Sequence, residues 1–123
     1  KGLQRLSNTK GTIAAAAMDQ RGSLQKSIAK AKGVDSNQVT QAMMEEFKVI
    51  VSKVLTPHAT AILLDPEFGL PAAKARAKNA GLLLAYEKTG YDAALEGRLP
   101  DLLMLESAKR IKEKGAIVSL MIN

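Results

Sequence analysis

Residues 12–22 constrain the fold of this chain most, because the apolar run TIAAAAM ends abruptly in the polar string DQRG. A short apolar run without alternating polar residues is typical of a strand that is buried on both faces of a parallel sheet. Two later runs show the same pattern: DPE follows residues 59–64, and EKTG follows residues 81–86. The sequence therefore predicts three strands that carry charged side chains at their carboxyl ends.

Two helical patterns separate the first two strands. A short helix is expected after Ser23, its N-cap, and should end near Gly33. A longer amphipathic helix follows and should end before Pro57, since proline cannot continue a helix. Its apolar residues recur at helical spacing and predict the face that packs on the sheet: Val39, Met43, Phe47, Ile50 and Val54.

The rest of the chain continues this alternation. A helix that begins at Leu70 precedes the third strand, and a helix over residues 101–114 precedes a fourth strand at residues 116–122. Alternating strands and helices imply right-handed crossovers and a parallel sheet. Charged residues at successive strand ends favour a (β/α)8 barrel over an open doubly wound sheet, and the glycine fingerprints of the open class do not follow any strand.

The length of the chain limits how much of a barrel it can form. A complete barrel needs about 250 residues, whereas this chain has 123. It begins with Lys1 rather than methionine and stops directly after an apolar run, so both ends read as cut. We therefore expect residues 1–123 to form the N-terminal half of a TIM barrel, with four parallel strands and no internal domain boundary. A self-contained open sheet is the alternative.

Composition narrows the function classes. Although the net charge is +6, the basic residues are scattered singly among acids, and the aromatic residues are two tyrosines and two phenylalanines. This pattern favours solvated helix faces over a nucleic-acid surface. A membrane span needs about 18 consecutive apolar residues, which the chain lacks, and without a signal-like start it is expected to be cytoplasmic. The absence of cysteine excludes thiol catalysis and thiolate metal sites.

Five segments, in chain order, resemble the tagatose-1,6-bisphosphate aldolase family. They are AAAAMDQRGSL at 14–24, AILLDPEFGLPAAKAR at 61–76, AGLLLAYEKTGYD at 80–92, GRLPD at 97–101 and SAKRIKEKGA at 107–116. The resemblance implies a (β/α)8-barrel lyase of the Schiff-base type, which needs no metal or cofactor. Such an enzyme cleaves a ketohexose bisphosphate into dihydroxyacetone phosphate and glyceraldehyde 3-phosphate. Barrels with a similar DQR motif also include sulfosugar-phosphate aldolases.

The resemblance gives roles to the polar residues after the first strand. The family's Asp-Gln pair, which contacts substrate, corresponds to Asp19 and Gln20. A carboxylate can accept hydrogen bonds from sugar hydroxyls, and an amide can both donate and accept. The alternative for Asp19 is an anion that caps the following helix. Arg21 could hold a phosphate, but a lock on the carboxylates of neighbouring strand ends is favoured.

The charged residues after the next two strands are expected to support the site. Asp65 and Glu67 could transfer protons, but we expect them to brace loops, with Asp65 nearer the site. Glu87 and Lys88 are adjacent and opposite in charge, which is typical of a structural ion pair.

The nucleophile itself is expected outside this sequence. In the family, the Schiff-base lysine and the main proton-transfer glutamate come from later strands, beyond residue 123. Within the chain, Lys88 is the fallback nucleophile, because it is the lysine at a strand end. The family also has a lysine in the fourth strand, where this chain reads IVSLMIN with Ser119 at that position. A changed substrate, an inactive paralogue or an unreliable terminal segment would each explain this difference.

The sequence thus predicts a lyase that acts on a phosphorylated sugar, and residues 1–123 alone are expected to be inactive. A related sulfosugar-phosphate aldolase is one alternative, and a non-catalytic sugar-phosphate-binding or regulatory protein on the same scaffold is another. No metal is expected, because the histidine, aspartate and glutamate residues lack metal-ligand spacing. No cofactor is expected from the resemblance, and the charge pattern and the lack of a long apolar run give no reason to expect nucleic acid or a membrane as a partner. A homo-oligomer remains open.

Overall fold

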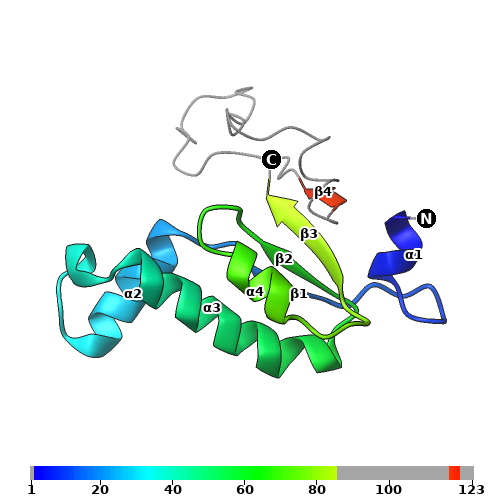
Figure 1. The fold of residues 1–123 in the computed structure, drawn as a ribbon, viewed down its shortest axis with the longest axis horizontal. Helices are drawn as coiled ribbons and strands as arrows, with labels where there is room; N and C mark the ends of the chain where they lie inside the picture. The colour runs from blue at the N-terminus through cyan, green and yellow to red at the C-terminus, as the bar shows by residue number, and fades with distance from the viewer. Residues whose placement is uncertain (1, 86–116, 120–123) are drawn as a thin grey trace.

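A computed structural model of the protein describes residues 2–85 and 117–119. Its centre is a parallel sheet with the strand order β1-β2-β3-β4 (Figure 1). The strands are β1 (Ala15–Met18), β2 (Ala61–Leu64), β3 (Gly81–Ala85) and β4 (Ile117–Ser119). Met18 is in register with Leu64, and Leu64 with Leu84, so the carboxyl ends of β1, β2 and β3 lie at one edge. The predicted α/β class with a parallel sheet is confirmed.

Helices alternate with β1, β2 and β3, and two of them cover the sheet. α3 and α4 pack against each other in front of β1 and β2 (Figure 1). The helical segments, with η for a short 3-10 helix, are α1 (Gly2–Leu6), α2 (Gly22–Lys32), η1 (Ser36–Gln38), α3 (Gln41–Leu55), η2 (Thr56–His58) and α4 (Leu70–Ala75). This arrangement leaves the carboxyl edge of the strands beside the N-terminal end of α2.

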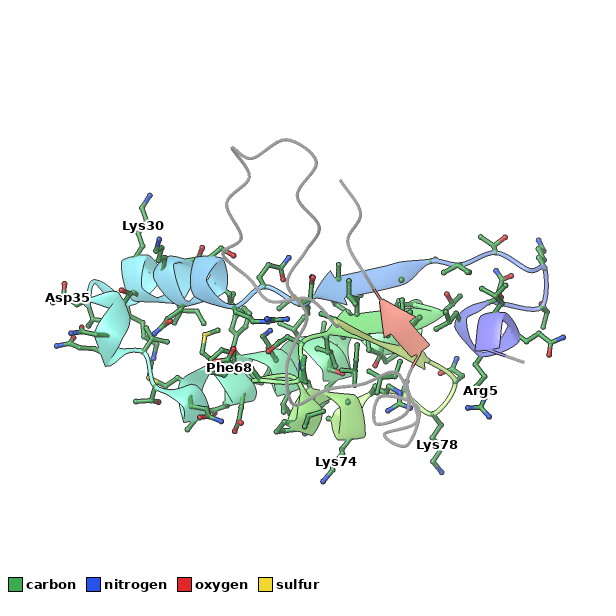
Figure 2. All side chains as sticks on the ribbon, turned by 90° about the horizontal axis from the view of Figure 1, so that it is seen from above. Arg5, Lys30, Asp35, Phe68, Lys74 and Lys78 are labelled. Atoms are coloured by element: carbon green, nitrogen blue, oxygen red, sulfur yellow. The ribbon has the colours of Figure 1, made fainter. Side chains whose placement is uncertain are left out.

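Two apolar clusters hold these layers together. The main cluster joins β2 and β3 to α4 and consists of Ile62, Leu64, Ala72, Ala73, Leu82 and Leu84. The second joins α2 to α3 and consists of Ala29, Val39 and Met44, with Phe68 packed against it (Figure 2). The side chains of Lys30 and Lys74 point away from the body of the protein (Figure 2). Burial of apolar surface is the main favourable contribution that both clusters make.

Most helix boundaries follow the local signals in the sequence. α2 ends before Gly33, which takes the left-handed φ of 68° that favours glycine. α3 ends two residues before Pro57, and α4 carries Pro71 in its first turn, both as predicted. The predicted N-cap at Ser23 is wrong, because α2 already begins at Gly22 and its N-cap residue is Arg21.

The predicted apolar face of α3 is buried only around the start of the helix, where Val39 is buried and Met43 is half-buried. Phe47, Ile50 and Val54 were expected to pack on the sheet, but they are 39%, 55% and 62% exposed. The face that is buried carries Met44, Lys48 and Ser52, which follow one another at intervals of four residues.

The buried polar side chains of this region have hydrogen-bond partners on neighbouring elements, which explains the difference. Ser52 Oγ donates to the Ala72 carbonyl of α4 at 2.9 Å. Thr56 Oγ1, just after α3, accepts from the Ala77 N–H at 2.8 Å. A buried polar group is tolerated when such a bond replaces its bonds to water. A search for apolar residues at helical spacing assigns polar residues such as Lys48 and Ser52 to the solvent-facing side, and therefore does not find the buried side of the helix.

Burial of the first strand differs from the prediction as well. In β1, Ala16 and Met18 are half-buried, whereas Ala15 and Ala17 are exposed. β2 agrees better with burial on both faces, because three of its four residues are buried and Leu63 is half-buried. Among the described residues, β1 is the end strand of the sheet, whereas β2 lies between two others, which accounts for the difference.

Several predictions fall on residues that the structure does not describe. The predicted helix over residues 101–114 lies outside the described residues, as do Glu87 and Lys88. In residues 2–85 and 117–119, none of the helices is both long and apolar enough to cross a membrane.

Candidate active site at the carboxyl ends of β1 and β2

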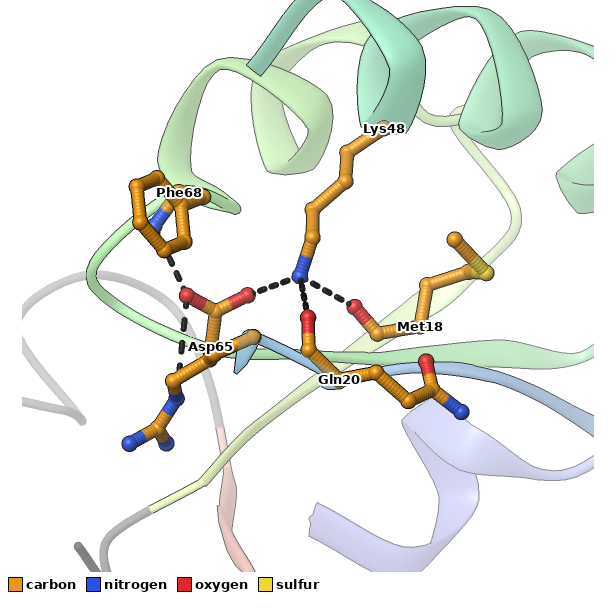
Figure 3. A network of polar contacts seen from close by, with 6 residues as sticks. Met18, Gln20, Lys48, Asp65 and Phe68 are labelled. Carbon is orange, nitrogen blue, oxygen red and sulfur yellow. Dashed lines mark hydrogen bonds and ion pairs between the residues drawn. The ribbon is translucent and has the colours of Figure 1, made fainter. Parts of the chain in front are cut away.

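A fully buried lysine of α3 ties the carboxyl ends of β1 and β2 together. Lys48 Nζ donates to the Met18 carbonyl at 2.9 Å and to the Gln20 carbonyl at 2.7 Å. It also donates to Asp65 Oδ1, with which it forms an ion pair (Figure 3). An ammonium group has three hydrogens, and these three acceptors use all of them. We call this group of contacts the Lys48 clasp.

Asp65 is the acidic member of the clasp and directly follows β2. It is fully buried, and its Oδ2 accepts a hydrogen bond from the Phe68 N–H at 2.7 Å (Figure 3). The Gly69 N–H donates to the Asp65 carbonyl at 3.0 Å. A Cβ on Gly69 would overlap that carbonyl oxygen, so the close turn needs glycine. The sequence DPEFG therefore folds around the carboxylate that it carries.

Arg21 brings a second positive charge to the same carboxylate. Its side chain is buried, and Nε lies 3.8 Å from Asp65 Oδ2. The ion pair links the start of α2 to the end of β2, which is the locking role favoured from the sequence. Charges buried this deeply are stable only when they are paired and hydrogen-bonded, and Asp65 is paired with both Lys48 and Arg21.

Asp19 and Gln20, the predicted substrate contacts, lie between β1 and α2 at the rim. Asp19 is half-buried and Gln20 is exposed. The Gln20 carbonyl points at Lys48, while its side-chain amide points away from the clasp (Figure 3). Arg21 occupies the N-cap position of α2, and Asp19 precedes it by two residues.

The other predicted site residues are placed differently. Glu67 is exposed in the turn after β2. Ser119 ends β4 and is in register with Ala85 at the end of β3, so it belongs to the same edge of the sheet. The structure thus brings together Arg21, Asp65 and the backbone of the Asp19-Gln20 segment.

Lys48 is the site residue that the sequence analysis missed. A pattern of polar residues at strand ends does not point to it, because Lys48 is in the middle of a helix. One signal was available: an acid directly after a buried strand needs a cation, and Lys48 shares its four-residue spacing with Met44 and Ser52. In the part of the chain that the structure describes, no group of three or more histidine, cysteine, aspartate or glutamate side chains could hold a metal ion.

A parallel sheet with polar groups gathered beyond its strand ends defines the class of α/β proteins that bind ligands at that edge. Residues 13–123 match the DeoC/LacD family aldolases. The chain belongs to this family, which confirms the resemblance found in its sequence.

Curated relatives share long stretches of sequence with this chain. Tagatose 1,6-diphosphate aldolase 2 of Enterococcus faecalis (strain ATCC 700802 / V583) is 62% identical over 93% of this chain and 33% of its own length. Tagatose 1,6-diphosphate aldolase of Listeria monocytogenes serotype 4a (strain HCC23) is 60% identical over 93% of this chain and 32% of its own. The enzyme of that name in Staphylococcus aureus (strain MW2) is 54% identical over 93% and 34%. The chain therefore spans about a third of the length of these relatives.

Proposed function

We propose that the full-length protein is a Schiff-base aldolase that cleaves a ketohexose bisphosphate such as tagatose 1,6-bisphosphate. The products would be dihydroxyacetone phosphate and glyceraldehyde 3-phosphate, and the reaction would be reversible. The observation that carries this proposal is the 62% identity to a named tagatose 1,6-diphosphate aldolase over 114 residues. The location of Asp19, Arg21 and Asp65 at one edge of a parallel sheet supports it, since barrel enzymes assemble their sites there.

The proposed architecture is a (β/α)8 barrel, of which residues 1–123 supply the first half. Two features support it. The strands run parallel in sequential order, and β1 ends the sheet with an edge that has no partner among the described residues. An exposed sheet edge promotes unwanted pairing, and closure into a barrel removes it.

The proposed chemistry proceeds through a lysine beyond residue 123. Its neutral amine would attack the C2 ketone, and loss of water together with uptake of one proton from a general acid would give a protonated Schiff base; the proton is returned on hydrolysis. A base would remove the proton of the C4 hydroxyl, the C3–C4 bond would break, and the Schiff base would accept the electron pair. Glyceraldehyde 3-phosphate then leaves. Protonation of the enamine at C3 and hydrolysis release dihydroxyacetone phosphate and restore the lysine.

Within this chain, Asp19 and Gln20 are the proposed substrate contacts. The carboxylate of Asp19 would accept hydrogen bonds from sugar hydroxyls, and the Gln20 amide would donate and accept. Arg21 and Asp65 would hold the rim in place, in keeping with their burial and their contact with each other. Glu67 is proposed to brace its loop and Glu87 to form a structural ion pair with Lys88, and a cytoplasmic location stays a prediction.

A trapping experiment tests the proposal. The full-length protein is incubated with dihydroxyacetone phosphate, reduced with borohydride and analysed by mass spectrometry for a lysine adduct. We expect one adduct on a lysine beyond residue 123; an adduct on Lys88 would instead support the fallback nucleophile. A protein without any adduct and without cleavage activity would contradict the proposal.

Ser119 favours a second candidate, a non-catalytic sugar-phosphate-binding or regulatory protein. The family's fourth-strand lysine is expected where this serine ends β4, next to β3. Binding of the bisphosphate without an adduct would support this candidate. If an adduct forms, a panel that includes a sulfosugar phosphate would separate the tagatose-type enzyme from a related sulfosugar-phosphate aldolase.

A further inference from the structure

The Lys48 clasp does more than join two strands, because two of its three acceptors flank Asp19. We propose that Lys48 is a positioning residue that fixes the backbone of the Asp19-Gln20 segment and thereby sets how these two residues meet the substrate. This inference rests on the proposed function for its effect on catalysis.

The geometry of the two carbonyl contacts carries the inference. Met18 O and Gln20 O accept from the same nitrogen at 2.9 and 2.7 Å, although one residue separates them. Each bond fixes the rotation of one peptide plane, and these planes lie on either side of the Asp19-Gln20 unit. Since the backbone has two soft dihedral angles per residue, fixing the flanking planes restricts the direction of both side chains.

The chemistry of the clasp suits an ammonium group and no other side chain. Lysine presents three hydrogens from one nitrogen, whereas the arginine guanidinium is planar and spreads its donors in a fixed fork. Asp65 supplies the counter-charge and, because it also accepts from the Phe68 N–H, is itself fixed in place. The clasp therefore has matched numbers of donors and acceptors around a fully buried charge.

Lys48 must act through other residues rather than on the substrate. Its side chain is fully buried, and its three hydrogens are donated to protein acceptors. A Schiff-base lysine, in contrast, needs a free electron pair and access to the substrate carbonyl. Its effect on the reaction must therefore pass through the segment that it holds.

The test compares Lys48→Met with Lys53→Met in the full-length protein. Lys53 is an exposed lysine of the same helix and serves as the matched control. We expect Lys48→Met to lower kcat/KM by about 100-fold, mainly through a higher KM, because the substrate contacts are displaced. Lys53→Met should keep both constants. A purely structural role would reduce the folded fraction, which lowers apparent kcat and leaves KM unchanged.

A second arm uses Asp19→Ala as the background. If Lys48 acts through the segment, adding Lys48→Met to Asp19→Ala should cost no more than about threefold further in kcat/KM, since residues that act as a unit are not additive. Losses that multiply in the double variant would overturn the proposal. Lys48→Arg keeps the charge and serves if Lys48→Met does not fold; the same rise in KM, smaller in size, is expected.

Hydrogen exchange separates failure of this inference from failure of the proposed function. Peptides that cover residues 18–22 should exchange faster in Lys48→Met than in wild type and in Lys53→Met. Unchanged exchange in this segment would overturn the positioning role, whatever the activity. If wild type neither cleaves nor forms an adduct, the proposed function fails, and the exchange result alone decides whether Lys48 holds the segment.

Discussion

At the scale of single residues, the Lys48–Asp65 pair combines a large desolvation cost with a large gain from electrostatic attraction and hydrogen bonds. Both side chains are fully buried, so both charges lose their hydration. Their mutual attraction and the bonds to Met18, Gln20 and Phe68 offset that loss. A pair of this kind contributes little net stability, but it becomes strongly destabilising once one partner is removed.

The first prediction follows from this asymmetry. Asp65→Asn in the full-length protein keeps an acceptor for the Phe68 N–H but removes the counter-charge of Lys48. We expect the free energy of unfolding to fall by about 3–5 kcal/mol, measured by chemical denaturation. Adding Lys48→Met should recover part of this loss, because the unpaired charge disappears. Single-variant losses that simply add in the double variant would show that the pair is uncoupled.

At the scale of elements, α3 shows that burial and hydrophobicity can separate within one helix. Its sheet-facing side carries Lys48 and Ser52, while its opposite side carries Phe47, Ile50 and Val54. The helix is held to the sheet by hydrogen bonds as well as by apolar packing. Its apolar outer side adds little to that attachment in the described part of the chain.

The second prediction compares the two sides of α3 in the full-length protein. Met44 is 1% exposed, and Met44→Ala should lower the free energy of unfolding by about 2–5 kcal/mol. Ile50 is 55% exposed, and Ile50→Ala should cost less than about 1 kcal/mol. Thermal and chemical denaturation measure both. Equal costs would contradict the exposure of the outer side of α3 and would mean that this side is covered in the full-length protein.

Much of this fold could be predicted because its signals are local. The apolar runs gave the strands, and Gly33, Pro57 and Pro71 marked the helix boundaries. The burial of Lys48 could not be predicted in the same way, since its acceptors lie 17, 28 and 30 residues away in sequence. For the same reason, the exposed face of β1 depends on the order of strands and not on its own alanines.

The candidate site also has one part that local sequence signals predict and one part that depends on distant contacts. Asp19 and Asp65 each directly follow an apolar run, and Arg21 comes two residues after Asp19, which is why the sequence points to them; the structure gathers their segments at one edge. The contacts that hold these segments in place could not be predicted from the sequence, because they come from Lys48 of α3, the helix between β1 and β2 in the chain. A lysine on such a helix looks like any solvated lysine until its partners are placed.

At the scale of the whole molecule, the chain covers about a third of its relatives, as the 33% share of the Enterococcus faecalis enzyme shows. The third prediction is that residues 1–123 alone have no measurable aldol cleavage activity, since the proposed nucleophile lies further along the chain. A coupled assay at equal molar concentration, with the full-length protein as control, measures this. Turnover by the isolated segment would contradict this prediction and place the nucleophile within residues 1–123, where Lys88 is the fallback.

The Lys48 clasp also determines the order in which segments of the chain can fold during synthesis. A ribosome releases the chain from its N-terminus, so Lys48 leaves the exit tunnel well before the carboxylate that will neutralise it. Asp65 lies 17 residues further on, and until it emerges the ammonium group of Lys48 stays hydrated, because burial of an unpaired charge is unfavourable. The stretch around Asp19, although translated early, therefore acquires its final shape only after the second strand has docked.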